Sequence, residues 1–202
     1  MRKSAVSDGS SNSRRVLQAA KQVFIRDGAA VFSARRVAKE VGLSLRSVQH
    51  YYPTTELLLA AVVDLVVEEF ESAFEALSQK LPFSAEARFL GVVEILLAAN
   101  WHQDTRRVFY GLYELSCYRS FAAKLMDRMY TRHAHYLAVL VGAARPNLSE
   151  KRCRELAIVI AAMLDGTMIF TAPGKDRLIS KKDLSNAVRS SVLALLDAPE
   201  AD

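Results

Sequence analysis

The chain has 202 residues, of which 51% are hydrophobic, and it carries a formal net charge of +5. This length allows one or two domains. The longest apolar stretches, 57–67 and 156–170, contain Asp64 and Asp165 and fall short of about 20 residues, so we expect no membrane-spanning helix. The polar N-terminus lacks the hydrophobic run of a signal peptide, and the two distant cysteines fit reduced thiols of a cytoplasmic protein.

The positive charge is concentrated at the N-terminal end. Residues 1–52 contain ten Lys and Arg but three acidic residues, a net charge of +7, whereas the remaining residues carry −2. A basic segment joined to a nearly neutral body is typical of a nucleic-acid-binding domain attached to a second domain. We predict a disordered tail over 1–12, a DNA-binding domain over 13–53 and a second domain over 54–202.

Three short helices are predicted in the basic segment. Apolar residues recur with helical spacing over Ser13–Asp27. Ser33 is a suitable N-cap for a second helix, which ends at Gly42 because glycine enters the left-handed region at little cost. Ser44 then caps a third helix over Leu45–Tyr52. Two helices joined by a tight turn that contains glycine form a helix-turn-helix, whose second helix enters the major groove of DNA.

The outward side of the predicted recognition helix, residues 45–52, is unusual for a short surface helix. Arg46, Gln49 and His50 are predicted to point outward, with no carboxylate among them, while Val48 points inward. Surface helices usually mix both charge signs. This composition therefore favours a DNA-binding helix over the alternative, an ordinary helical hairpin.

The rest of the chain predicts six further helices and no β-strand. They cover 54–81, 84–103, 105–118, 120–144, 150–171 and 180–196. The predicted fold class is therefore all-α, with nine helices arranged as a three-helix DNA-binding unit and a larger helical domain.

No residue spacing favours catalysis or metal binding. His133 and His135 diverge by about 200° on a helix and cannot share a metal ion. The chain has no H-E-x-x-H, E-x-x-H or G-x-S-x-G spacing. His102 and Asp104 could flank a site, but they fit the polar end of a helix better. We predict no enzyme, no metal and no cofactor, and an all-α enzyme is the remote alternative.

The middle helices carry many aromatic residues. Large apolar rings with a few polar groups typically line a pocket between bundle helices, although a solid core is the alternative. The predicted ligand-binding residues are Phe70, Phe74, Glu94, Leu97, Trp101, Phe109, Tyr110 and Tyr113.

Glu94 suggests the chemistry of the ligand. It shares one helix stripe with Leu97 and Trp101, so it is expected to be buried, and an unpaired buried carboxylate is costly. Its partner is either an arginine such as Arg128 or Arg132, or a cationic ligand that also contacts the Trp101 ring. We predict a small apolar effector, with or without a positive charge.

The last two helices predict an association between two copies. Residues 156–164 are apolar on every side, so one side is expected to pack on the chain itself and another to need a cover. Two such helices from each of two chains make a four-helix interface, and burial within a monomer is the alternative. The predicted interface residues are Leu156, Val159, Ile160, Met163, Thr167, Leu184, Val188, Val192 and Leu195.

One set of N-terminal residues has the spacing of a known family. These residues are Phe24, Gly28, Ser33, Val37, Ala38, Val41, Gly42, Leu43, Ser44, Val48, His50, Tyr51, Tyr52, Pro53, Glu56, Leu57 and Leu58. The set resembles the DNA-binding domain of TetR-family transcriptional regulators. The motif covers roughly residues 13–60, and beyond it only the helical layout is similar.

The resemblance implies that the first three helices bind DNA, that the larger domain binds a small effector, and that the last two helices form a homodimer. It implies a repressor that an effector releases from a palindromic operator. A regulator controlled by a protein partner is the alternative. The predicted DNA-binding residues are Arg35, Ser44, Leu45, Arg46, Ser47, Gln49, His50, Tyr51 and Thr55.

Three positions depart from the family's pattern. The family commonly has Lys where this chain has Thr55, Tyr where it has Gln49, and His where it has Tyr51. Without the Lys, one ionic phosphate contact is lost, although a threonine hydroxyl can still donate to a phosphate oxygen. We expect an altered operator preference or a weaker affinity.

Overall fold

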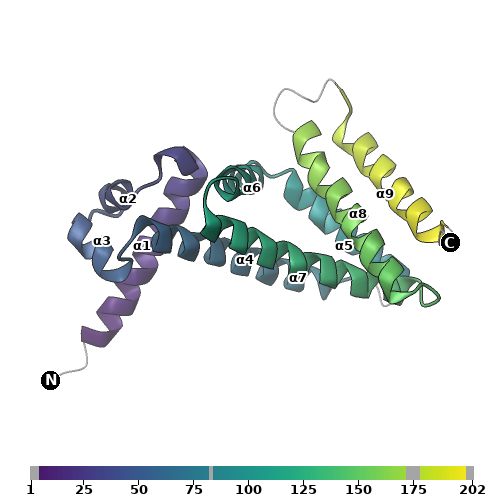
Figure 1. Ribbon diagram of the computed structural model, residues 1–202, viewed down its shortest axis with the longest axis horizontal. Helices are drawn as coiled ribbons and strands as arrows, with labels where there is room; N and C mark the ends of the chain where they lie inside the picture. Colours follow the sequence, from purple (N-terminus) through teal and green to yellow (C-terminus); the bar gives the residue numbers. More distant parts are fainter. Residues whose placement is uncertain (1–4, 82–83, 172–177, 199–202) are drawn as a thin grey trace. The chain divides into compact units, whose positions relative to one another are not determined.

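A computed structural model of the protein describes residues 5–81, 84–171 and 178–198 (Figure 1). Over these residues it contains nine α-helices, one 3₁₀ turn and no strand, which confirms the predicted all-α fold. The elements are α1 Ala5–Asp27, η1 Ala29–Val31, α2 Ala34–Val41, α3 Leu45–Tyr51, α4 Thr55–Ser78, α5 Ala85–Asn100, α6 Gln103–Ser116, α7 Ser120–Ala144, α8 Glu150–Phe170 and α9 Lys181–Asp197. None of these helices is long and apolar enough to cross a membrane.

The chain forms two compact units that do not follow the order of the sequence. The first comprises the described residues up to Glu71 together with Arg107–Asp127. The second comprises Ser72–Arg106 and the described residues from Arg128 onward. Helices α4, α6 and α7 therefore contribute to both units. The predicted domain boundary after residue 53 stays a prediction, and the structure groups the first part of α4 with α1, α2 and α3.

The core of the first unit is built on the apolar stripe of α1. Val16 and Val23 are fully buried, as are Val37 of α2 and Val48 of α3. Such burial supplies most of the stability of short helices, because helices of this length are marginal in isolation. Phe24 extends the core by packing edge-to-face on Phe32, with ring centroids 6.0 Å apart.

The turn between α2 and α3 has the predicted caps. The Ser33 hydroxyl accepts a hydrogen bond from the backbone N–H of Arg36, and the Ser44 hydroxyl accepts one from that of Ser47. Gly42 between them has φ 73°, in the left-handed region, and Leu43 N–H donates to the Ala38 carbonyl at 3.0 Å. The two caps and the glycine thus fix where α2 ends and α3 begins.

The start of α1 differs from the prediction. A disordered tail was predicted over 1–12, but α1 is already helical at Ala5, and residues 1–4 lie outside the described part of the chain. Serine, asparagine and glycine are weak helix formers, but a helix anchored by the burial of Val16 can extend, since each added residue gains a backbone hydrogen bond. The Asn12 side chain also accepts a hydrogen bond from Arg15 at 2.9 Å.

An ion-pair network ties α1 to α2. Asp27 at the end of α1 accepts hydrogen bonds from Arg26 and, at 2.7 Å, from Arg36 near the start of α2. Arg26 also donates through both terminal nitrogens to Glu40, near the end of α2. Because two points of α2 are held, the network helps to fix the orientation of α2, and through the turn that of α3.

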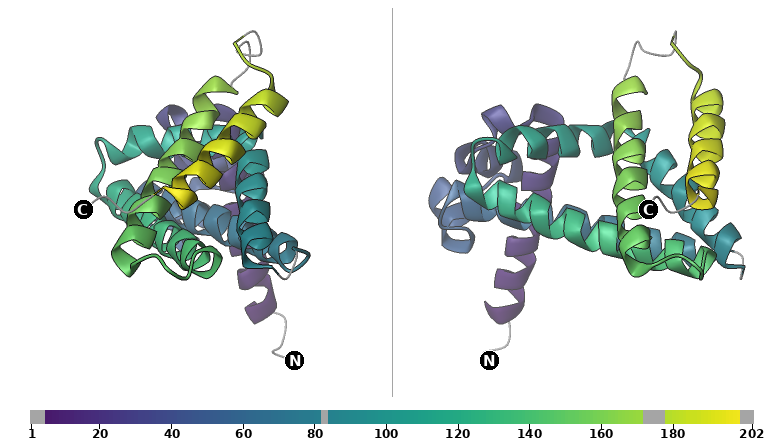
Figure 2. Two further views of the ribbon diagram at one scale, coloured as in Figure 1. Left: turned by 90° about the vertical axis from the view of Figure 1, so that its right-hand side faces the viewer. Right: turned by 45° about the vertical axis from the view of Figure 1, so that its right-hand side comes forward.

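The second unit is built on α8, which lies beside α9 (Figure 2) and also packs on α5. Leu156, Ile160 and Leu164 of α8 are buried. The buried Asn100 side chain at the end of α5 donates to the Leu164 carbonyl at 2.9 Å. Polar pairing thus accompanies the apolar contact between α5 and α8, as a buried amide requires.

Arg145, just after α7, joins three helix ends of the second unit. Its guanidinium donates to Glu86 in the first turn of α5 at 2.5 Å and to Asp197 at the end of α9 at 2.8 Å. It also donates to the Ala144 carbonyl at the end of α7. The guanidinium therefore links α5, α7 and α9 at one end of the unit.

The turn at Gly42 gives a first prediction. We expect Gly42→Ala to lower the free energy of unfolding by about 1–2 kcal/mol, because an L-residue is strained in the left-handed region. A Cβ there would touch nothing within 4 Å, so the cost is a backbone cost alone. The control is Gly166→Ala within α8, where the same methyl group also meets nothing within 4 Å. That change should raise stability by up to about 1 kcal/mol through helix propensity. Urea unfolding measures the change in the free energy of unfolding for both variants. A change of the same sign in the two variants would contradict the role assigned to the left-handed backbone at Gly42.

The ion-pair network gives a second prediction. Hydrogen bonds from Arg26 and then Arg36 hold the pKa of Asp27 well below its ordinary value of 3.8, and Arg26 also lowers the pKa of Glu40. A lowered folded-state pKa contributes stability at pH values above the ordinary pKa, and this contribution is lost as the pH falls below it. Asp27→Asn should therefore destabilise the protein near neutral pH.

The difference between Asp27→Asn and the unchanged chain should shrink below about pH 4. Urea midpoints measured over a pH series test this. The control is Glu150→Gln, which removes a fully exposed carboxylate paired with Arg154 at 3.5 Å. Its effect should be small at every pH. A pH-independent loss in Asp27→Asn would contradict the network's role.

Candidate functional site

The exposed side of α3 carries the three residues that the sequence predicts to read DNA bases. Arg46, Gln49 and His50 are exposed, whereas Val48 is fully buried on the opposite side. The His50 and Tyr51 rings meet edge-to-face with centroids 5.2 Å apart. No carboxylate belongs to this helix. The exposed side of α3 therefore offers a guanidinium, an amide and an imidazole on a helix that has no acidic residue.

The other predicted DNA-binding residues surround α3 or are engaged locally. Arg35 is exposed on α2. The Ser44 and Ser47 hydroxyls bond each other at 2.7 Å, which reduces their freedom to contact another molecule. Leu45 and Thr55 are half-buried. The cap of α4 is the neighbouring threonine, Thr54, whose hydroxyl accepts from Leu57 N–H at 3.1 Å.

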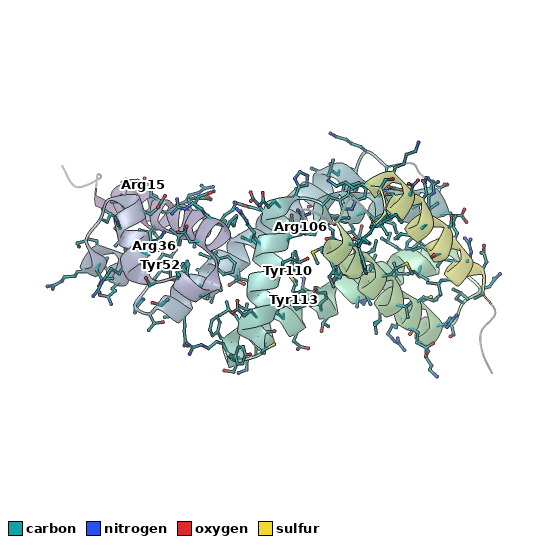
Figure 3. The ribbon with its side chains drawn as sticks, turned by 90° about the horizontal axis from the view of Figure 1, so that it is seen from above. Arg15, Arg36, Tyr52, Arg106, Tyr110 and Tyr113 are labelled. Atoms are coloured by element: carbon teal, nitrogen blue, oxygen red, sulfur yellow. The ribbon has the colours of Figure 1, made fainter. Side chains whose placement is uncertain are left out.

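The first unit also has a polar groove that the sequence did not indicate. It has a volume of about 650 Å³ and is lined by Ser11, Arg14, Arg15, Gln18, Ala19, Gln22, Glu40 and Val41. Figure 3 labels Arg15, which lies on the α1 side of the groove. Glu40 is already engaged by Arg26, so the charge that the groove offers is positive. The groove arises from the pairing of α1 with α2, which no sequence pattern specifies.

The end of α3 is attached to α1. The Tyr52 hydroxyl lies 3.3 Å from the Ser13 hydroxyl, within hydrogen-bonding distance. This contact fixes the residue after α3 to the first helix. The orientation of the exposed side of α3 thus depends on both the α1 contact and the turn at Gly42.

The predicted ligand-binding residues are divided between the two units. Phe70, Phe109, Tyr110 and Tyr113 belong to the first unit, and Phe74, Glu94, Leu97 and Trp101 belong to the second. Leu97 is fully buried, Tyr110 and Tyr113 are exposed, and the other five are half-buried. The assignment of these eight residues to one ligand site stays a prediction.

The second unit shows what surrounds Trp101 and Glu94. The Nζ of Lys181 lies over the Trp101 ring, 5.9 Å from its centroid. The ammonium group of Lys181 thus occupies the position over the Trp101 ring that was predicted for a cationic ligand. Glu94 is half-buried, and among the described residues no side chain pairs with it.

Arg106 is a further polar residue of this region that sequence reasoning did not single out. It lies in the first turn of α6, and Tyr110 and Tyr113 follow it along the same helix (Figure 3). Arg106 is only 7% exposed. Arginines are usually exposed, so the sequence gave no signal that this one is buried.

The structure corrects part of the predicted dimer interface. Leu156, Ile160, Thr167, Val188 and Val192 are buried within the chain itself, so their side chains are not free to contact a second copy. Val159 is 47% exposed, and Met163, Leu184 and Leu195 are half-buried. The physical reason is that α8 is apolar on all sides, and its composition does not specify which side faces α5 and α9.

Comparison with known proteins adds to this geometry. The sequence profile of bacterial regulatory proteins of the tetR family matches residues 16–62. No curated protein sequence matches the chain. Many solved structures share the fold at low sequence identity.

Three of these structures are of regulators. A putative transcriptional regulator from Pseudomonas aeruginosa has a TM-score of 0.78 and 16% identity, with 93% of this chain and 91% of that one covered. One from Saccharomonospora viridis, solved in complex with choline, has a TM-score of 0.78 and 20% identity, with 91% and 96% covered. A TetR regulator from Haloarcula marismortui has a TM-score of 0.75 and 18% identity, with 93% and 97% covered.

At these identities the solved structures establish the fold. The profile match, over residues 16–62, includes α2 and α3. The matched segment contains the turn at Gly42 and both serine caps. Residues 16–62 therefore match the DNA-binding segment of the tetR family, and the whole chain has the fold of the solved regulators.

Proposed function

We propose that the protein acts in the cytoplasm as a homodimeric repressor, which binds a palindromic operator and is released from it by a small-molecule effector. The observation that carries this proposal is the exposed side of α3, where Arg46, Gln49 and His50 lie on a helix that contains no carboxylate. Arginine pairs with guanine and glutamine with adenine in the major groove. A helix-turn-helix dimer reads two half-sites related by its two-fold axis, so the operator is palindromic.

The exposed side of α8 supports the dimer. Ile158 and Val159 are 60% and 47% exposed, and Ile169 and Phe170 at the end of the same helix are 58% and 50% exposed. Apolar side chains gathered on one side of a helix favour a protein partner over solvent. A second copy of α8 offers the same apolar residues, as a two-fold interface requires.

The effector part of the proposal is supported by two observations. The similar regulator from Saccharomonospora viridis was solved with choline, so this fold can hold a small molecule. In this chain, Tyr110 and Tyr113 are exposed on α6 although their rings are largely apolar. A ligand that binds more tightly to the state unable to bind DNA would weaken DNA binding. The loss in DNA-binding free energy cannot exceed the difference between the ligand's binding free energies for the two states.

Selection of bound sequences from a random duplex pool tests the function. We expect a palindrome whose half-sites are separated by one helical turn or a multiple of it. A recovered site without two-fold symmetry would contradict the homodimer. Recovery of no sequence preference, with affinity that depends on salt alone, would contradict an operator-specific regulator.

Base readout by α3 gives a third prediction. Arg46→Ala should reduce discrimination at one operator base pair by about 1–3 kcal/mol, because a bidentate contact with a base edge is lost. Tyr51→Phe should weaken operator and random DNA alike, because a hydroxyl near phosphate carries no sequence information. Competition binding with single-base operator variants measures both. Arg154→Ala, an exposed arginine on α8, is the control and should change neither. Equal losses on operator and random DNA in Arg46→Ala would contradict its assignment to base readout.

The dimer gives a fourth prediction. Val159→Asp should yield a folded monomer with reduced operator affinity, because a charge is placed on the proposed interface while the chain's own core is unchanged. Val192→Asp is the contrasting variant, and it should unfold the second unit because Val192 is fully buried. Sedimentation equilibrium and circular dichroism separate the two effects. The unchanged chain sedimenting as a monomer at micromolar concentration would contradict the proposal.

A further inference from the structure

Among the described residues, no acidic side chain balances the charge of Arg106. Its Nη1 donates to the backbone carbonyls of Asn100 at 3.3 Å and Trp101 at 2.6 Å, the last residue and the C-cap of α5. No described carboxylate lies within ion-pair distance of this guanidinium. The carbonyls at a helix C-terminus carry only about half an elementary negative charge. A positive charge therefore remains on a side chain that is 7% exposed.

The remaining hydrogen-bond donors of Arg106 are available. A guanidinium has five N–H donors, and the two carbonyls occupy those on Nη1, so the donors on Nε and Nη2 have no acceptor among the described residues. Buried arginines are usually paired, because an uncompensated charge in the interior is costly. Arg106 Nε and Nη2 are not among the described nitrogens that are sealed from solvent without an acceptor. They therefore keep some contact with solvent, from which an acceptor can approach.

Trp101 supplies a second unused donor beside Arg106. Its indole Nε1–H is sealed from solvent and has no acceptor among the described residues. A buried donor without a partner costs about 1–3 kcal/mol, so an unpaired indole N–H is unusual unless another molecule pairs with it. The Lys181 ammonium over the Trp101 ring adds a second positive charge to the same region. Donors and positive charges together favour an acceptor that is negatively charged.

We propose that the effector of this regulator is a small oxyanion with an apolar body, recognised by Arg106 through Nε and Nη2 and by the Nε1–H of Trp101. The planar fork of a guanidinium fits two oxygens of a carboxylate or a phosphate. This inference rests on the proposed function, because it names the chemical class of the effector. It replaces the expectation of a cationic effector at Glu94, since Glu94 is half-buried and can be hydrated, whereas Arg106 is only 7% exposed.

Four probes that share a phenyl ring test the charge preference on the full-length protein. They are benzoate, phenyl phosphate, benzamide and benzylammonium. Calorimetric titration should show saturable binding of benzoate or phenyl phosphate, and the stronger of the two identifies the oxyanion. Benzamide should bind at least about tenfold more weakly, because charge-assisted hydrogen bonds are lost. Equal or tighter binding of benzylammonium, or no saturable binding of either anion, would overturn the inference.

Two variants test the residues without removing the support that Arg106 gives to α5. Trp101→Phe keeps an aromatic ring beneath Lys181 but removes the N–H. It should weaken binding of the preferred anion about tenfold without lowering the melting temperature of the free protein, because that N–H bonds to none of the described residues. Arg106→Lys keeps the charge but loses the fork, and it should also weaken binding.

The control for net charge is Arg107→Gln, which changes the exposed neighbour on α6 and should leave anion affinity unchanged. Anion affinity that is unaltered in both Trp101→Phe and Arg106→Lys would overturn the site. DNA binding measured on the same samples separates the two proposals. An unchanged chain that binds its selected DNA but no oxyanion contradicts this inference alone, whereas a chain that binds no DNA contradicts the proposed function.

Discussion

The left-handed backbone at Gly42 is the constraint on which the DNA-binding unit depends. Helix α2 has eight residues and α3 has seven, too few to be stable alone. Each needs a defined end, so that its apolar side meets α1 while its polar side stays exposed. Gly42 ends α2 without steric cost, and Ser33 and Ser44 satisfy the backbone donors at the two helix starts. The position of Arg46 and Gln49 follows from this geometry.

The second unit uses a different balance between apolar and polar contacts. Helix α8 buries one side against α5 and α9, and polar groups at the end of α5 are satisfied across this contact by the Leu164 carbonyl. Two groups beside the end of α5 lack full compensation among the described residues, the guanidinium of Arg106 on α6 and the indole N–H of Trp101. Folded proteins tolerate few such groups, and those that remain are frequently located where a ligand binds.

The tetR-family profile over residues 16–62 and the shared fold support the predicted class of the protein, a DNA-binding regulator. The uneven charge has a structural counterpart, because Asp27 and Glu40 are both engaged by arginines of the same unit. The cations that remain, such as Arg35 and Arg46, are therefore available for phosphates and bases. The recognition helix and the polar groove between α1 and α2 belong to the same unit.

The sequence by itself determined the helices, the turn and the outward residues of α3, because caps, glycine and the period of apolar residues are local signals. It did not determine which side of α8 is covered, since an apolar helix has no sidedness, and so Leu156 and Val192 were assigned to the wrong surface. Nor did it indicate that Arg106 is buried while Glu94 stays half-exposed. Burial of a charge depends on which helices surround it, and only the tertiary structure decides that.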